Sequence, residues 1–144
     1  MNKLPLFLSL FLSASLVQAQ EPEFCPLSEI LPNLPKKDLS NLLAAEHGFI
    51  MFGAEWCAPC RRVHPLFDNL KDIAQENNIP SNYLSFDYID IDLFSTDYEF
   101  LEECINGIPA IVETENYQET RRYGPHQIEE LEQHIRQLID AYQQ

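Results

Sequence analysis

The sequence predicts a single α/β domain in which short apolar strands alternate with amphipathic helices. A chain of 144 residues has the length of one domain with its own core. The apolar run at 49–53 has the length of a buried strand, and it leads directly into a segment with helical apolar spacing at 58–77. Three further strand-like segments and two further helical segments then complete the chain.

The first half of the domain contains two helices around one strand. Residues 38–45 form a short amphipathic helix that ends before Gly48, a residue type common just after helices. The strand 49–53 and the long helix 58–77 follow. The inner face of this helix is predicted to comprise Val63, Leu66, Phe67, Leu70, Ile73 and Ala74.

The second half of the domain alternates in the same way. Residues 83–91 alternate in polarity and are predicted to form a central strand, and 99–104 are predicted to be helical. Residues 110–112 begin an antiparallel pair with 119–123, with the turn at Glu115–Asn116. The apolar stripe of the last helix is predicted to be Ile128, Leu131, Ile135, Leu138 and Tyr142.

The N-terminal residues have the pattern of a secretory signal peptide. Lys3 precedes an apolar run at 4–17, and small residues lead to a cleavage position near Ala19. We therefore expect residues 1–19 to be a signal peptide, with an uncleaved anchor as the alternative. A Pro-rich lead at 20–37 and the folded domain at 38–144 would follow, and the mature protein would be periplasmic or secreted.

The chain is strongly acidic, with a formal net charge of −14. Between residues 72 and 119 there are twelve acidic side chains and no Lys, Arg or His. This distribution argues against nucleic acids and anionic membranes as partners. Asp90 and Asp92 share one face of a predicted strand, but we see no further ligands near them and predict no metal site.

The most informative motif is Cys57-Ala58-Pro59-Cys60, at the predicted junction of the buried strand and the long helix. The positive end of the helix dipole would stabilise a thiolate at Cys57. Cys60, one turn further on, could then attack a mixed disulfide formed at Cys57. Pro59 suits the first turn, which does not use its missing amide. The spacing predicts a redox-active pair.

Other uses of such a pair fit the sequence less well. A structural zinc site needs four ligands, and no second pair follows at a suitable spacing. Haem attachment would place His directly after Cys60, where Arg61 stands. A purely structural disulfide remains open, although so short a loop contributes little through closure entropy.

Five separated motifs resemble the thioredoxin family in that family's order. They are the active-site stretch 54–61, Pro65 in the following helix, the strand end 89–92, the loop 107–109 and the strand end 123–124. The resemblance covers residues 38–142. It implies a thioredoxin fold, with a central mixed β-sheet flanked by helices on both faces.

The resemblance also implies roles for residues around the Cys pair. Pro109 is similar to the family's cis-proline, which would turn the backbone of Ile108 toward an extended substrate strand. From its own chemistry, the ring of Trp56 would shield the pair from water and offer a flat docking surface, with simple packing as the alternative. From the Cys motif and the resemblance together, we assign Cys57 and Cys60 as the catalytic residues.

The sequence departs from the family pattern beneath the active site. Met51 stands where thioredoxin keeps a buried carboxylate, and Tyr88 stands where the partner lysine lies. The family's acid–base pair is therefore absent as a unit, and we expect resolution by Cys60 to be slower or to use water. Gly53 replaces a bulky aromatic residue, so we expect a looser floor beneath the pair.

Three basic residues follow the Cys pair on the predicted helix. His64 lies one turn after Cys60 and, when protonated, could favour a thiolate, although a surface role beside Pro65 is the alternative. Arg61 and Arg62 would either stabilise the Cys57 thiolate or lie in solvent.

The remaining cysteines are Cys25 and Cys104, which bring the total to four. In an oxidising compartment an even count favours a second bridge. We name Cys25–Cys104 as a candidate structural disulfide, since the sequence alone does not decide connectivity.

Together these features predict a periplasmic thiol–disulfide oxidoreductase, and we expect a reductant because Ala58-Pro59 lacks the His of strongly oxidising members. Alternatives are a disulfide-forming oxidant or isomerase, and a binding module whose Cys pair is structural or holds a metal. The partners would be client thiols and disulfides and, for a reductant, a membrane electron donor. We expect a monomer and no cofactor beyond the redox-active disulfide.

Overall fold

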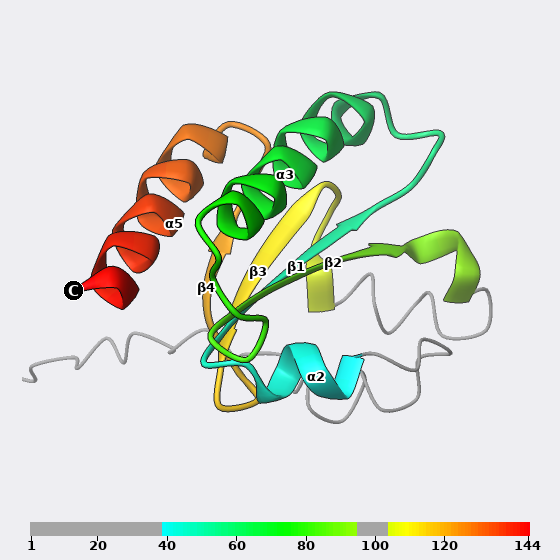
Figure 1. Cartoon of the computed structure of the whole chain (residues 1–144). Coiled ribbons are helices and arrows are strands. Elements are labelled where there is room, and N and C mark those ends of the chain that lie inside the picture. The colour runs from blue at the N-terminus through cyan, green and yellow to red at the C-terminus, as the bar shows by residue number, and fades with distance from the viewer. Residues whose placement is uncertain (1–38, 95–103) are drawn as a thin grey trace, which may run out of the picture.

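The computed structural model describes residues 39–94 and 104–144. The predicted signal peptide at 1–19 and lead at 20–37 lie outside these residues, as does most of the helix predicted at 99–104. Within the described residues, a four-stranded mixed sheet has the order β2-β1-β3-β4 (Figure 1). None of the helices in these two ranges is both long enough and apolar enough to cross a membrane.

Strand β1 (His47–Gly53) lies in the interior of the sheet. It pairs in parallel with β2 (Leu84–Asp90) and antiparallel with β3 (Ala110–Glu115). Its residues from Phe49 to Phe52 are fully buried, because helices cover both faces of the sheet and both sets of alternating side chains reach a core. This is why the run is continuously apolar rather than alternating.

Strand β2 lies at the edge of the described sheet and not at its centre, so this prediction is wrong for the described residues. Its central residues Asp87 and Tyr88 are only partly buried, in keeping with an edge position. A short 3-10 helix, η2 (Ile91–Phe94), follows and ends the first described range.

Strands β3 and β4 (Gln118–Tyr123) form the predicted antiparallel hairpin. The turn residues are Asn116 and Tyr117, with φ values of 50° and 68°, one position later than predicted. Two successive left-handed residues form the tight turn whose twist matches that of the flanking strands. Asn adopts this conformation readily, whereas Tyr117 does so under the constraint of the hairpin.

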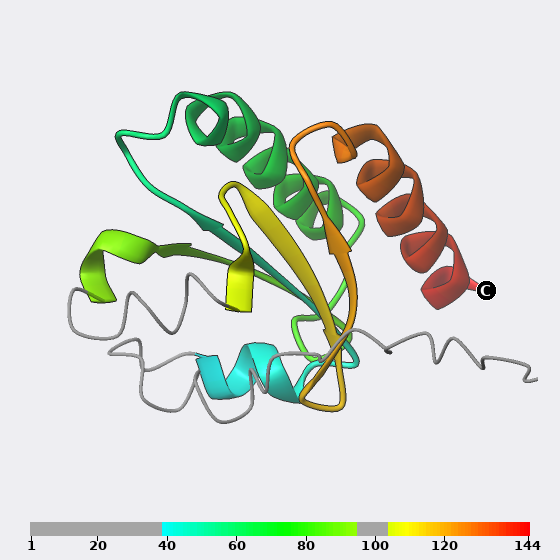
Figure 2. The same ribbon diagram turned by 180° about the vertical axis from the view of Figure 1, so that it is seen from behind.

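Helices α3 (Ala58–Glu76) and α5 (Ile128–Gln143) pack on one face of the sheet, and α2 (Leu39–Ala44) lies on the other (Figures 1 and 2). Helix α3 ends where Asn77 caps it and Asn78 turns left-handed, with φ of 55°. The helices thus cover both faces, as the predicted α/β architecture requires.

At two helix positions the structure differs from the predicted inner face. Leu66 of α3 is 48% exposed, because the buried stripe follows Cys60, Val63, Phe67, Leu70 and Ala74. Tyr142 of α5 is 47% exposed, and Ile139 completes the stripe begun by Leu131 and Ile135. In both helices the apolar residue at the margin of the stripe lies beyond the arc that the sheet covers.

Candidate active site

The Cys pair lies at the N-terminus of α3, a few residues after the end of the buried strand β1. Cys57 is the N-cap residue, and its Sγ accepts a hydrogen bond from the backbone N–H of Cys60 at 3.2 Å. The two residues form a disulfide with a Cα–Cα distance of 5.2 Å. Cys57 is 6% exposed and Cys60 is 1% exposed, so client access is mainly to Cys57. A thiolate at Cys57 would gain from the free amides and dipole of the helix.

The turn before the helix is fixed by its own backbone and by one arginine. The amide of Cys57 donates to the carbonyl of Ala54 at 3.1 Å, and the amide of Arg61 donates to the carbonyl of Cys57 at 3.1 Å. The guanidinium of Arg61 also donates to the carbonyl of Glu55 at 2.7 Å. Arg61 therefore braces this turn from the surface, where Arg62 is exposed as well.

The indole of Trp56 is 60% exposed beside the Cys pair, so its ring is available as a surface. Its Nε1 donates to Oδ1 of Asp92 at 3.0 Å, which fixes the ring direction. Asp92 follows β2 and was interpreted from the sequence only as a strand end. Nothing in the spacing of residues 56 and 92 indicated this contact.

The loop before β3 faces the Cys pair. The Ile108–Pro109 peptide bond is cis, and the carbonyl oxygen of Ile108 lies 3.9 Å from Sγ of Cys57. Gly107 has φ of 109°, a conformation that other residues rarely adopt, so the glycine allows the loop to reach this position. Ile108 is partly exposed and Pro109 is buried.

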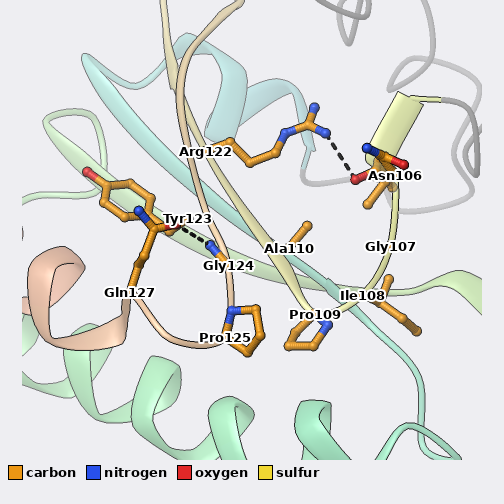
Figure 3. Close-up of a pocket in the computed structure, with 11 residues that line it drawn as sticks. Asn106, Gly107, Ile108, Pro109, Ala110, Arg122, Tyr123, Gly124, Pro125 and Gln127 are labelled. Carbon is orange, nitrogen blue, oxygen red and sulfur yellow. Dashed lines mark hydrogen bonds between the residues drawn. The ribbon is translucent and has the colours of Figure 1, made fainter.

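A pocket of about 410 Å³ adjoins this loop, between residues 105–110 and 122–127 (Figure 3). Arg122 of β4 donates from Nη1 to the carbonyls of Cys104 and Ile105 at 2.8 and 3.0 Å. Its guanidinium also forms two hydrogen bonds with Glu119, both of 2.8 Å. Arg122 therefore anchors the loop to the hairpin, a role that the sequence analysis missed.

Beneath the Cys pair the structure corrects the expected loose floor. A Cβ placed on Gly53 would lie 3.0 Å from both Cε2 and Oη of Tyr88, and 3.4 Å from Cβ of Cys60. The Tyr88 side chain thus fills the space that Gly53 leaves. Met51 is fully buried in the same strand and offers no carboxylate, as expected.

The ring of His64 stacks on Tyr88, with centroids 3.8 Å apart and planes within 14°. Its Nε2 lies 3.6 Å from Asp68 on the next helical turn. Burial, followed by the negative charges of Asp90, Asp92 and Glu55, raises the pKa of Tyr88, so its hydroxyl stays protonated at neutral pH. The sequence placed His64 one turn after Cys60 but did not indicate its stack on Tyr88.

Cys104 is partly buried and is itself disulfide-bonded. Cys25 lies outside the described residues, so the Cys25–Cys104 pairing stays a prediction.

Comparison with known proteins agrees with this geometry. The family model described as thioredoxin matches residues 33–137. The chain belongs to the thioredoxin family. Thioredoxin-3 and thioredoxin-2 of Dictyostelium discoideum are 23% and 27% identical to it over 84 residues, which cover 58% of this chain and 72% and 85% of theirs.

Two solved structures illustrate the shared fold. Oxidised thioredoxin from Plasmodium falciparum has a TM-score of 0.51 at 22% identity, covering 68% of this chain and 86% of that one. The zinc-bound form of human ERp44 has a TM-score of 0.59 at 25% identity, covering 72% of this chain and 30% of that one. Family membership and the Cys57–Cys60 pair identify the chain as a thiol–disulfide oxidoreductase.

Proposed function

We propose that this protein reduces disulfides in client proteins outside the cytoplasm, with Cys57 as the attacking thiolate and Cys60 as the resolving thiol. The observation that carries the assignment is the position of Cys57 Sγ, at the helix N-cap and 3.9 Å from the carbonyl of Ile108. A helix N-terminus favours the thiolate, and the neighbouring loop backbone can align an extended client.

The reaction proceeds by two thiol–disulfide exchanges. The Cys57 thiolate attacks one sulfur of the client disulfide, forms a mixed disulfide and releases the other client sulfur as a thiolate. Cys60, as thiolate, then attacks Sγ of Cys57, forms the Cys57–Cys60 disulfide and releases the second client thiolate. Two electrons pass from the protein to the client, and no cofactor beyond the dithiol is required.

The surroundings of Cys57 support the substrate-binding roles. The exposed Trp56 ring, fixed by Asp92, offers a flat apolar surface for the client. The backbone of Ile108 can form β-type hydrogen bonds with an extended client segment. Pro109 has no N–H, so it adds no further backbone donor to this pairing. The pocket beside this loop would receive a client side chain.

The reducing direction and the location rest on sequence features. Ala58-Pro59 contains no His to stabilise the Cys57 thiolate further, which favours a thioredoxin-like potential. The signal-like residues 1–19 favour the periplasm or export. A reductant there needs electrons from the cytoplasm, so a membrane-bound dithiol donor would regenerate Cys57 and Cys60.

Insulin reduction with dithiothreitol tests the proposal, with the wild type compared with Cys57→Ser. We expect the wild type to accelerate insulin precipitation and the variant to lose this activity. Equal rates for the two proteins would favour a binding module with a structural Cys pair. The buried apolar Met51 is the feature that favours this second function.

A further inference from the structure

A second group of chemically active side chains lies at the other end of the sheet from the Cys pair. His47 begins β1, whereas Cys57 follows its end, so the strand separates the two groups by about 20 Å. Glu113 and Glu115 project from one face of β3, near its end. The β1–β3 register places His47 opposite Glu115, one residue beyond the pair Gly48–Thr114.

The three side chains bring their ligand atoms together. Nδ1 of His47 lies 3.2 Å from Oε1 of Glu115 and 3.9 Å from Oε1 of Glu113, and all three atoms lie within 4.8 Å of one another. Bonds of about 2.0–2.2 Å to a tetrahedral zinc ion place ligand atoms about 3.4 Å apart. The cluster therefore needs only small side-chain movements to surround one ion.

The His47 ring nitrogen is not satisfied by the protein. Nδ1 is buried and, within the described part of the chain, makes no aligned hydrogen bond, although Glu115 is only 3.2 Å away. A buried nitrogen without a partner costs free energy. The His47 nitrogen and the Glu115 oxygen lie close together without hydrogen-bond geometry, as two ligands of one metal ion would.

The neighbours of the cluster hold its central carboxylate in place. The side chain of Glu113 is only 4% exposed, and Nε2 of His134 on α5 lies 2.8 Å from its Oε1. The hydroxyl of Tyr123 donates to its Oε2 at 3.4 Å. Arg121, which faces Glu113 in the β3–β4 ladder, pairs with Glu130 instead. Among the described residues, no lysine or arginine forms an ion pair with Glu113 or Glu115.

We propose that His47, Glu113 and Glu115 bind a Zn²⁺ ion, with His134 positioning Glu113. One imidazole and two carboxylates compensate a double positive charge, and such a mixed donor set suits zinc better than calcium, which takes six or more oxygens. Glu115 is 43% exposed, so the ion can enter from solvent and keep a water in its fourth position. This site is not predictable from the sequence, because residues 47, 113 and 115 are brought together only by the fold.

The test is zinc titration calorimetry on the untagged mature protein with the Cys57–Cys60 disulfide closed, so that these thiols cannot bind the metal. We expect one zinc per chain. Cobalt(II) in its place should give absorption bands of nitrogen and oxygen ligands without a thiolate band. This readout is independent of the redox activity, so either proposal can fail alone.

Variants separate ligation from folding. Glu115→Gln keeps the shape of a partly exposed side chain, and we expect it and His47→Ala to weaken zinc binding at least tenfold. His134→Gln should weaken it by about 10–100-fold, as loss of a group that holds a ligand does. Exposed control variants, His126→Ala and Glu129→Gln, should bind as the wild type does. The proposal is wrong if the wild type binds no zinc or if either ligand variant retains wild-type affinity.

Discussion

Replacement of Gly53 by Ala probes the contact of Tyr88 with the active-site floor. The new Cβ would lie 3.0 Å from Cε2 and Oη of Tyr88, against an optimum of about 3.5–4.0 Å for carbon contacts. The Tyr88 ring cannot withdraw freely, because His64 stacks on it at 3.8 Å. On the other side of the new methyl group, Cβ of Cys60 lies at 3.4 Å.

The net effect follows from two opposed terms. Overpacking a filled site costs about 1–3 kcal/mol, whereas Gly→Ala within a strand gains about 0.5–1 kcal/mol through the unfolded chain. We therefore expect Gly53→Ala to lower the free energy of unfolding by about 1 kcal/mol. In a Tyr88→Ala background the clash is gone, and the same change should raise the free energy of unfolding by about 0.5 kcal/mol.

Urea unfolding of the oxidised wild type, both single variants and the double variant, followed by circular dichroism, measures this cycle. The coupling free energy between the two sites should be about 1–2 kcal/mol. Gly53→Ala should lower the free energy of unfolding in the wild-type background and raise it in the Tyr88→Ala background. If Gly53→Ala stabilises the wild type as much as it stabilises Tyr88→Ala, Tyr88 does not fill the space beneath the Cys pair.

Three further predictions concern potential, resolution and alkaline stability. Equilibration with glutathione should give a reduction potential below about −200 mV, and a value near about −120 mV would instead indicate an oxidant. Met51→Asp should speed the release of a mixed disulfide in stopped-flow measurements, and it should lower the free energy of unfolding by about 1–3 kcal/mol. Because burial raises the pKa of the new carboxyl group, this loss of stability should grow as pH rises above about 4. An unchanged release rate would show that the missing carboxylate does not limit resolution. Burial, with the charge of Glu113, raises the pKa of Tyr123 to about 12, so the folded state favours the neutral phenol, and its contribution to stability should be lost as pH rises from about 10 to 12. Between about pH 10 and 12, the free energy of unfolding measured with urea should therefore fall by about 2 kcal/mol less in Tyr123→Phe than in the wild type. Parallel plots of unfolding free energy against pH for the two proteins would contradict this role of Tyr123.

The Cys pair could be located from sequence because its setting is local. A buried run of apolar residues followed by a Cys-Ala-Pro-Cys turn specifies a strand, a helix start and a thiol at the helix N-terminus within about a dozen residues. The hairpin was equally accessible, since Glu115–Asn116 marks a turn between two strand-like segments, although the turn lies one residue further on.

Contacts between segments that are distant in the chain could not be predicted from the sequence. Tyr88 beneath Gly53 could not be foreseen, because adjacency of β1 and β2 does not show which side chain fills a vacated space. The bonds from Trp56 to Asp92 and from Arg122 to the loop carbonyls likewise depend on tertiary packing. Leu66 was misplaced because periodicity gives the centre of a buried stripe better than its edge.

The role of Cys57 as the client-attacking residue is tested most directly by trapping. Reduced Cys60→Ala protein, incubated with a disulfide-bonded peptide, should accumulate a mixed disulfide that cannot be resolved, and mass spectrometry of its digest should locate the peptide on Cys57. The matched Cys57→Ala protein should form little adduct, because Cys60 is only 1% exposed. Attachment of the peptide mainly at Cys60 of the Cys57→Ala protein, with no adduct at Cys57 in the other variant, would contradict the proposed roles of the two residues.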